Sequence, residues 1–271
     1  MLPITIRTVT DYLETISPVS YQESYDNAGL VVGYPTTEVR GILTTLDITE
    51  QVLEEAVVQG CNLVISHHPL IFRPLYKVDQ GSVGRAITYA IQNKLALYSL
   101  HTNLDYVMGG VNTALGKRLG LSNLSFLKRL PIPSDSSVVS SLDRGAGMIG
   151  SLPQPLSEED FLAYLKEKLS LTTFRYSSTR KQSIQQVAIA GGVGIGLLPD
   201  ALAASADAFV TADIKYHQFL DSDYQLLLVD IGHYESEVHV KTLLAHYLSE
   251  KFNKIVLKES TIISNPIKYY V

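Results

Sequence analysis

Apolar and polar residues along the chain form blocks of two kinds, some with the two-residue repeat of a strand and others with the 3.6-residue repeat of a helix. Between residues 40 and 121 these blocks alternate, with short links between them. The expected strands cover 40–49, 61–66 and 96–105, and the expected helices cover 49–60, 81–95 and 109–121. This order is typical of βαβ units, in which helices pack on a largely parallel sheet. Before these units, residues 8–17 predict a first helix with Thr8 or Thr10 as its N-cap.

A second series of blocks follows Ser157, which is the expected N-cap of a helix over 157–171. The remaining expected elements are strands at 186–192, 206–213, 224–232 and 254–260, short helices at 197–205 and 213–223, and a long helix at 235–252. Residues 121–157 are rich in proline, glycine and serine, which predicts a loop region and a boundary. We therefore expect two α/β parts with largely parallel or mixed sheets flanked by helices. Residues 1–126 and 226–271 would form the metal-binding part, and 127–225 the smaller part.

Composition narrows the class of protein. The chain has 271 residues, of which 46% are apolar and 18% charged, which fits a globular fold rather than a disordered chain. Its 22 basic and 27 acidic residues give a net charge of -5, which does not support nucleic acid as a partner. No apolar run approaches the roughly 18 residues of a membrane span. The only cysteine, Cys61, adjoins an apolar run, so we expect a core residue in a cytoplasmic protein.

Histidines and carboxylates gather where three of the expected strands end. Ligand sites of open parallel sheets form beyond the carboxyl ends of the strands, where the loops converge. The residues in question are His67, His68, His101, Asp105, His233 and Glu237. Their joint placement at three strand ends favours one site over three unrelated turns.

His233 and Glu237 are four residues apart in an expected helix, so both side chains should face the same side and could hold one cation. At about 100° per residue, His239 and His246 should lie on nearly the opposite face, in surface or packing positions. A plainer alternative for the first pair is an N-terminal capping arrangement, since a glutamate is favourable near the positive end of a helix.

His67 and His68 are adjacent and precede Pro69. Adjacent side chains on an extended backbone point to opposite faces, so the pair could serve two neighbouring metal ions. Asp105 and Glu237 each have two oxygens and could bridge ions about 3.5 to 4 Å apart. A hydrogen-bonded turn remains the plainer alternative for the histidine pair, and Asp105 could be an ordinary turn former.

A pair of metal ions that keeps open coordination positions suits hydrolysis by activated water better than a closed structural site. We therefore expect a metal-dependent hydrolase, with His101 or His217 in proton transfer. The alternative is a protein without enzymatic activity, in which the metals fix a scaffold or a partner-binding ring.

Three further stretches carry polar or glycine residues. Gly192, Gly194 and Gly196 do not match the G-x-G-x-x-G pattern of dinucleotide sites, so turn geometry or close approach to a partner is the better interpretation. The stretch 213–217 could orient a substrate, act in acid–base chemistry or form a subunit contact. The turn at Asp26 could lie in a loop beside the site or be structural only.

The chain resembles a known family over most of its length. The stretches that carry the resemblance are YDNAGLVVG, SHHPLIF, HTNLD, GGVGIG, ADAFVTADIKYH and GHYESE, in this order. They resemble the dinuclear-metal-centre family of GTP cyclohydrolase 1 type 2 homologs, related to NGG-interacting factors. The resemblance implies a two-part α/β fold, a pair of metal ions in a cleft between the parts, and homo-oligomeric rings, commonly hexamers.

Carried over to this sequence, the metal ligands of the family fall on the same set that the strand ends select: His67, His68, Asp105, His233 and Glu237. His101 would then face the substrate or support a ligand. The chain departs from the family at Tyr25, where tryptophan is usual, and it lacks the middle domain of longer members. Imidazole and carboxylate ligands suit two divalent ions of zinc, iron, manganese, cobalt or nickel. We expect an unidentified small-molecule substrate, for which the family name suggests a nucleotide-like compound.

Overall fold

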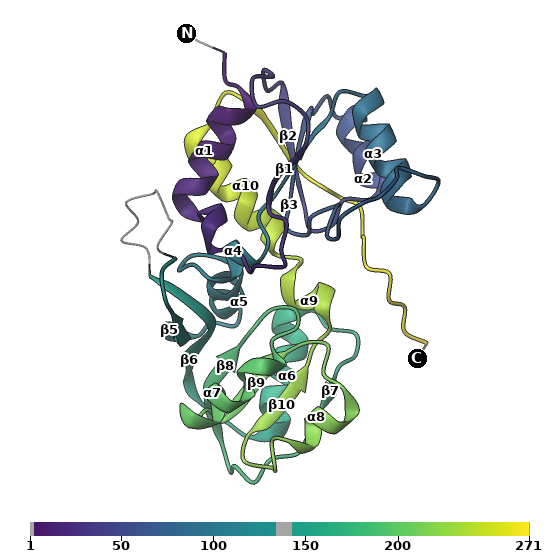
Figure 1. Ribbon diagram of the computed structural model, residues 1–271. Helices are drawn as coiled ribbons and strands as arrows, with labels where there is room; N and C mark the ends of the chain where they lie inside the picture. Colours follow the sequence, from purple (N-terminus) through teal and green to yellow (C-terminus); the bar gives the residue numbers. More distant parts are fainter. Residues whose placement is uncertain (1–2, 134–142, 271) are drawn as a thin grey trace. The chain divides into compact units, whose positions relative to one another are not determined.

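The structure is a computed structural model, and it describes residues 3–133 and 143–270. The chain divides into two compact α/β units, each with one sheet flanked by helices, as expected (Figure 1). Unit 1 consists mainly of Met1–Leu104 and Val240–Pro266, and unit 2 mainly of Asp105–Ile132, Leu142–His239 and Ile267–Val271. The expected borders at residues 126 and 225 both fall inside unit 2, because the neighbouring strands are hydrogen-bonded into its sheet.

Unit 1 contains a five-stranded sheet in the order β1-β4-β3-β2-β11. Its strands are β1 (Gly29–Val32), β2 (Gly41–Thr45), β3 (Leu63–Ser66), β4 (Ala96–Ser99) and β11 (Val256–Glu259). Its helices are α1 (Ile6–Ile16), η1 (Val19–Tyr21), α2 (Glu50–Val58), α3 (Ser82–Gln92), α4 (Thr102–Asp105, of which Asp105 belongs to unit 2) and α10 (Val240–Lys251). Only the edge strand β1 runs antiparallel to its neighbour, β4.

Threonine side chains cap α1 and α2 of unit 1. The Thr49 side chain accepts a hydrogen bond from the Val52 amide and begins α2, as expected. Helix α1 begins earlier than expected, because Thr5 rather than Thr8 or Thr10 is the N-cap. Thr5 and Thr8 form a reciprocal capping box there, which makes Thr8 part of the first turn.

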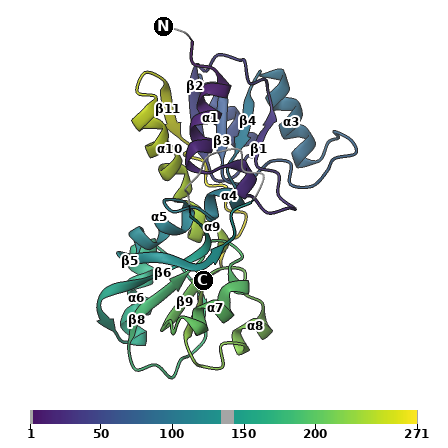
Figure 2. The same cartoon turned by 60° about the vertical axis from the view of Figure 1, so that its left-hand side comes forward.

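Helices cover both faces of this sheet, with α2 and α3 on one side and α1 and α10 on the other (Figures 1 and 2). On the α2 and α3 side, Val64 and Leu97 of the central strands pack with Val52 and Ala90. Cys61 belongs to this same core and is only 2% exposed, as expected for a packing residue. Burial raises the pKa of its thiol, against a lowering influence of Lys258.

Unit 2 contains a six-stranded mixed sheet in the order β5-β6-β8-β9-β10-β7. Its strands are β5 (Ser122–Leu130), β6 (Arg144–Leu156), β7 (Arg175–Tyr176), β8 (Ile184–Ile189), β9 (Ala208–Thr211) and β10 (Leu227–Asp230). Its helices are α5 (Val111–Arg118), α6 (Glu158–Leu169), η2 (Ile195–Leu197), α7 (Leu198–Ala203), α8 (Tyr216–Leu220) and α9 (His233–Glu237).

Alternate side chains of the strands in unit 2 belong to two different cores, one on each face of the sheet. Val187 and Ile189 of β8 belong to the core under α5 and α6. Ala188, between them, belongs to the core under α7 and α8. Because successive side chains of a strand point to opposite faces, strands with both faces buried read as continuous apolar runs. Strands β8, β9 and β10 were recognisable in the sequence for this reason.

The expected loop region at 121–157 is wrong over most of its length. It forms the antiparallel strands β5 and β6, and only its segment 134–142 lies outside the described residues. The glycines that suggested a loop instead permit close packing within the sheet. A Cβ atom on Gly145 would lie 2.3 Å from the Phe126 ring, and one on Gly150 would lie 2.9 Å from Leu124. These glycines mark close packing between β5 and β6 rather than a break in the strands.

The expected long helix at 235–252 is also corrected. The structure divides this stretch into α9, which begins two residues earlier, and α10, which begins at Val240. His233 and Glu237 therefore share a short helix of their own. No helix within the described ranges has the length and apolar character needed to cross a membrane.

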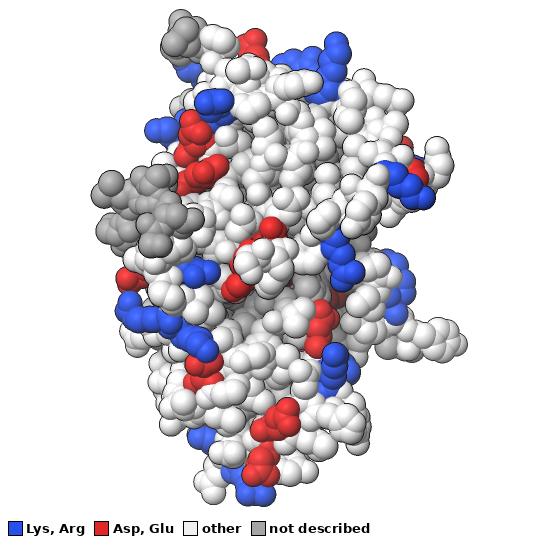
Figure 3. Space-filling model, viewed as in Figure 1, with Lys and Arg blue, Asp and Glu red and all other residues white. Residues whose placement is uncertain are grey.

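Charged side chains are interspersed on the surface. On the face that Figure 3 shows, lysine and arginine alternate with aspartate and glutamate and form no large patch of one sign. This distribution agrees with the small net charge and gives no sign of a phosphate-binding surface on that face.

Candidate metal centre

The loops that carry the histidines of unit 1 leave the same edge of its sheet. Strands β2, β3 and β4 are parallel, with Thr45 opposite Ser66 and Ser66 opposite Ser99. The residues that follow each strand end must therefore lie near one another. Asp47 follows β2, His67 and His68 follow β3, and His101 follows β4.

A local turn brings the adjacent histidines together. The Ser66 hydroxyl donates a hydrogen bond to the His68 carbonyl oxygen, two residues further along the chain. The ring centroids of His67 and His68 lie 5.1 Å apart, and those of His67 and His101 lie 5.3 Å apart. The three rings therefore form one compact cluster.

All three rings use Nδ1 for a hydrogen bond inside the protein. The His67 Nδ1 lies 2.8 Å from the Leu100 carbonyl oxygen, and the His68 Nδ1 lies 2.7 Å from Asp47 Oδ1. The His101 Nδ1 lies 2.7 Å from Asp26 Oδ1. A carbonyl or an ionised carboxylate can only accept, so Nδ1 carries the proton in each ring and a neutral ring has its lone pair on Nε2.

This arrangement suits metal ligation. Metal-binding histidines commonly donate their second ring nitrogen to a carboxylate or carbonyl, which fixes the tautomer and the ring orientation. One ring nitrogen from each of His67, His68 and His101 lies within 4.8 Å of the other two. The three rings could therefore share an ion.

Asp26 belongs to a loop beside this cluster, which agrees with one of the two interpretations of its turn. Its Oδ2 accepts a hydrogen bond from the Thr102 hydroxyl at 2.5 Å and from the Thr102 amide at 3.1 Å. Burial by itself would raise the pKa of Asp26, but the hydrogen bonds from His101 and Thr102 outweigh it and lower the pKa to about 2. Asp26 is therefore ionised at neutral pH and can hold the proton of His101 on Nδ1.

Two aromatic rings extend from the cluster to the surface. Phe72 packs edge-on against His101, with centroids 5.9 Å apart, and Tyr25 packs edge-on against Phe72 at 6.3 Å. Tyr25 is 63% exposed. The departure from the family pattern at Tyr25 therefore concerns an exposed ring that packs on Phe72.

Unit 2 repeats the same pattern in α9. The His233 Nε2 lies 3.1 Å from Glu237 Oε2, so the expected pairing across one helical turn is confirmed. The His233 Nδ1 lies 2.8 Å from Asp213 Oδ2. Glu237 is buried and His233 is partly exposed. This imidazole and carboxylate could contribute two ligands to a metal ion.

Asp105, the last residue of α4, also belongs to unit 2. Its carbonyl oxygen accepts a hydrogen bond from the Asn112 side chain, whose own oxygen accepts one from the Gly191 amide at 2.8 Å. Asn112 therefore links the helix that carries Asp105 to the glycine loop beside Glu237.

The backbone of the glycine loop approaches Glu237 closely, in agreement with the preferred interpretation of its sequence. Gly192 has a φ of 58° and lies against the Glu237 carboxylate. The Gly192 amide donates to the Ser236 hydroxyl at 2.9 Å, and the Gly194 amide donates to the Thr211 hydroxyl at 3.0 Å. The first bond holds the loop backbone against α9, and the second holds it at the end of β9.

Other histidines lie elsewhere. His217 is on the exposed side of α8, edge-on to Tyr216, and the groups of described residues that could share an ion do not include it. The His239 Nε2 donates to the Val111 carbonyl oxygen, and His246 is exposed beside Glu250. Asp47, the partner of His68, is missing from the candidates of the sequence analysis because the expected strand at 40–49 includes it, whereas β2 ends at Thr45.

Comparison with known proteins identifies the family of the chain. The family model for Duf34/NIF3 (NGG1p interacting factor 3) matches residues 4–267. A GTP cyclohydrolase 1 type 2 homolog from Clostridium perfringens is 33% identical over 260 residues, which cover 93% of this chain and 95% of the relative. The crystal structure of Staphylococcus aureus protein SA1388 has a TM-score of 0.90 at 33% identity, covering 99% of this chain and all of that one. A Bacillus cereus protein related to NIF3 shares the fold, with a TM-score of 0.90 at 23% identity. Since the family model covers nearly the whole chain, the protein belongs to the Duf34/NIF3 family.

Proposed function

We propose that the protein binds two divalent metal ions and is a metal-dependent hydrolase. The proposed ligands are His67, His68, Asp105, His233 and Glu237. The observation that carries the proposal is the shared hydrogen-bond pattern, in which His67, His68 and His233 each commit Nδ1 to an acceptor. Each ring would then present Nε2 to an ion, and the buried carboxylate of Glu237 lies in contact with one of these atoms.

The chemistry of the donor set fits ions such as zinc, iron, manganese, cobalt or nickel, which accept both imidazole and carboxylate ligands. Such ions, when bound, lower the pKa of a water molecule and polarise the bond to be hydrolysed. The protein residues contribute by fixing ligand orientation. Asp47 and Asp213 hold the tautomers of His68 and His233, and Gly192 leaves room for the Glu237 carboxylate.

We assign proton transfer to His101. Asp26 accepts the Nδ1 proton of His101, so the Nε2 lone pair can receive a proton from water. The ionised Asp26 would then stabilise the resulting imidazolium. His217 is the less favoured candidate, because its ring lies on the exposed side of α8.

The substrate is proposed to be a small molecule. Relatives bear the name GTP cyclohydrolase 1 type 2 homolog, which suggests a nucleotide-like compound. The name by itself assigns no reaction to this chain, so a screen should include nucleotides, phosphoesters and amides.

The deciding experiment is elemental analysis of protein purified without chelator or nickel affinity resin. We expect about two metal equivalents per chain, as in two-metal hydrolytic sites, and a reduced content in His68→Ala and Glu237→Ala. His246→Ala is the matched control, since His246 is exposed and forms an ion pair with Glu250 of the same helix. Absence of metal in the parent after incubation with each candidate ion would contradict the proposal.

The alternative function is a metal-holding or partner-binding ring without enzymatic activity. The observation that favours assembly is an apolar cavity of about 680 Å³ in unit 1, beside the edge strand β1. Its lining includes Val32, Tyr34 and Ile91, of which Tyr34 is 77% and Ile91 62% exposed. We propose that a second copy of the chain covers this surface in a homo-oligomer, for which the family resemblance suggests a hexamer.

Light scattering would test this assembly. Ile91→Asp should lower the molar mass of the particle, whereas the control Val58→Asp, at an exposed position of α2, should leave it unchanged. Chelation distinguishes the two functions. If the metal is structural, its removal should lower the melting temperature strongly, whereas removal of a catalytic pair should leave the melting temperature nearly unchanged.

We propose the cytoplasm as the location, because the lone buried Cys61 needs no oxidising compartment.

A further inference from the structure

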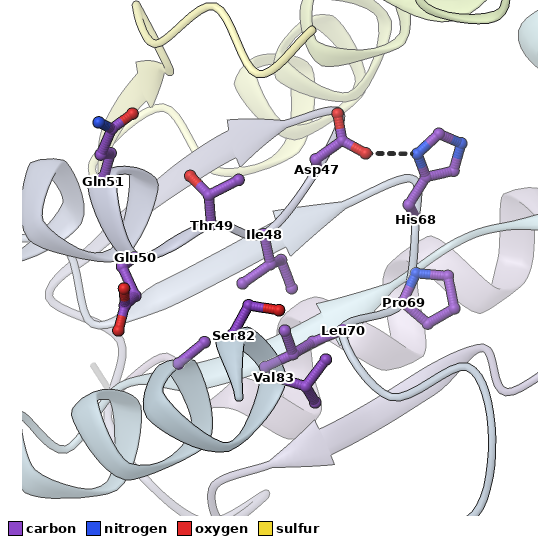
Figure 4. Close-up of a pocket in the computed structure, with 11 residues that line it drawn as sticks. Asp47, Ile48, Thr49, Glu50, Gln51, His68, Pro69, Leu70, Ser82 and Val83 are labelled. Atoms are coloured by element: carbon purple, nitrogen blue, oxygen red, sulfur yellow. Dashed lines mark hydrogen bonds and ion pairs between the residues drawn. The ribbon is translucent and has the colours of Figure 1, made fainter. Parts of the chain in front are cut away.

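A second cavity in unit 1 lies beside the histidine cluster. It has a volume of about 420 Å³, which is within the range of small-molecule sites. It opens between the first turns of α2 and α3, beyond the ends of β2 and β3, and its wall includes His68 (Figure 4). A molecule in this cavity would therefore touch the imidazole that we propose as a metal ligand.

The floor of this cavity is apolar. The side chains of Ile48, Leu70 and Val83 converge at its centre (Figure 4). Ala86 also lines the cavity. Ile48 and Ala86 are buried, whereas Leu70 and Val83 are partly exposed. A flat ring or a short hydrocarbon group would cover these atoms and remove apolar surface from water.

The polar rim of the cavity combines acidic side chains with the neutral side chains of Thr49, Gln51 and Ser82. It contains the carboxylates of Asp47 and Glu50, and none of its lining residues, all within the described part of the chain, is lysine or arginine. Asp47 already accepts hydrogen bonds from His68 and, at 2.5 Å, from the Ser264 hydroxyl. Glu50 Oε1 accepts one from Arg85 Nε at 2.8 Å, with the Glu50 side chain 37% exposed.

The starts of the two helices do not reverse this charge. A helix N-terminus carries roughly half a positive charge, whereas each carboxylate carries a full negative one. At the start of α2, the Thr49 side chain already accepts a hydrogen bond from the Val52 amide, and Glu50 adds a negative charge. The Gly81 amide before α3 donates to Asp79 at 2.9 Å. The cavity therefore favours hydrogen-bond donors and disfavours phosphate.

From this chemistry we infer that the cavity binds an uncharged or cationic nitrogen-containing ring of the substrate, beside His68. The inference rests on the proposed function, because it places the reacting bond at the metal ligands and the ring in the adjoining cavity. Any phosphate group of a nucleotide-like substrate must then lie outside this cavity.

The test uses three probes of the same size and shape but different charge: benzamidine, benzamide and benzoate. Each is titrated into the full chain, freed of metal by chelation, while amide and histidine ring signals are followed by NMR. We expect benzamidine to bind about tenfold more tightly than benzamide, because hydrogen bonds to a charged group are the stronger ones. Benzoate should bind most weakly, and the bound probes should shift the His68 ring signals.

Variants separate the cavity from non-specific binding. Val83→Phe should fill the cavity and abolish binding of benzamidine and benzamide, whereas Val58→Phe on exposed α2 should change nothing. Glu50→Gln, which preserves shape, should remove most of the preference for benzamidine over benzamide. Arg85→Gln should strengthen that preference by releasing Glu50 from its ion pair.

Benzoate binding as tight as that of benzamidine would overturn the inference, as would probe binding that Val83→Phe leaves intact or that does not perturb His68. Because the probes are measured without metal, this outcome is independent of the metal analysis. Metal content of Val83→Phe, measured separately, should match that of the parent. A chain that binds the probes as expected but no metal would contradict the proposed function and remove the link between this cavity and hydrolysis.

Discussion

Gly192 and Glu237 are in such close contact that a side chain at the first would displace the carboxylate of the second. A Cβ atom on Gly192 would lie 2.4 Å from Glu237 Oε1 and 3.3 Å from the His233 ring. Gly192 also has a φ of 58°, which residues other than glycine rarely adopt. The glycine loop thus determines where a proposed metal ligand can lie, although it provides no ligand itself.

Gly192→Ala should therefore weaken metal binding more than it weakens the fold. The Glu237 carboxylate ends a flexible side chain and can move away from the new methyl group, but it then leaves its position beside His233. We expect a loss of roughly 10–100-fold in metal affinity, measured by competition with a chelating dye. Gly196→Ala is the matched control, because a Cβ atom there meets no atom within 4 Å. Equal affinities in the two variants would contradict this role of Gly192.

Asp213→Asn should disturb His233 without changing the backbone. Asp213 has a φ of 56°, and asparagine is one of the residues that tolerate such a conformation. An amide can donate to Nδ1, which would move the ring proton to Nε2, the atom that faces Glu237. We expect about a 10-fold or greater loss of metal affinity and an altered tautomer of His233 in nitrogen NMR spectra. Asp223→Asn, at an exposed position with a φ of 44°, should behave like the parent.

His101→Gln tests whether this residue transfers protons or binds metal. If His101 acts in proton transfer, the variant should retain the metal content of the parent while hydrolysis of any substrate found for the parent falls by about 10²–10⁴-fold. The Asp26→Asn variant should show the same effect in weaker form, because it removes the acceptor of the Nδ1 proton. A drop in metal content in His101→Gln would instead place this ring among the ligands, beside His67 and His68.

The hydrogen bonds of the Glu55 carboxylate should make the stability of unit 1 depend on pH. Its carboxylate accepts hydrogen bonds from the Ser260 hydroxyl at 2.5 Å and from the Thr261 amide at 2.8 Å. Burial alone would raise its pKa, but these bonds lower the pKa below its ordinary value of 4.5. Because the folded-state pKa is the lower one, this contribution is present above pH 4.5 and is lost as the pH falls through the folded-state pKa.

Urea unfolding of Glu55→Gln should therefore show a loss of about 1 kcal/mol at neutral pH, and this difference from the parent should shrink in acid. Glu54→Gln, on the exposed neighbouring position, provides the control. A difference that persists at low pH would mean that the charge of Glu55 does not account for the stabilisation.

The sequence selected the histidines of the candidate site and suggested a loop at Asp26 beside it, but it did not pair Asp26 or Asp47 with a histidine ring. His67, His68 and His101 could be recognised because each follows a buried strand, which is a local property of the chain. Their partners come from distant positions, since Asp26 precedes His101 by 75 residues and Asp47 precedes His68 by 21. Strand pairing brings these residues together, since β2 lies beside the parallel strand β3 and β1 lies beside the antiparallel strand β4. The pairing and register of strands are not visible in composition or spacing.

The mistaken loop at 121–157 has a related cause. Glycine, proline and serine usually mark turns, and in this stretch they obscure the alternation of apolar residues. In β6, however, Met148 and Leu152 contribute to the core of unit 2 while Gly145 and Gly150 accommodate side chains of β5. Whether a glycine breaks a strand or permits close packing depends on its neighbour across the sheet, and the pairing partner is absent from the local sequence.

The burial of Cys61 provides a reporter of local opening in unit 1. A thiol that is 2% exposed and has a raised pKa should react with a labelling reagent only when the core around it opens. Unit 2 has no cysteine, since Cys61 is the only one in the chain. The labelling rate under native conditions would therefore measure the opening free energy of unit 1 alone, and repeating it with and without added metal would show how strongly ligation at the strand ends is coupled to the core beneath them.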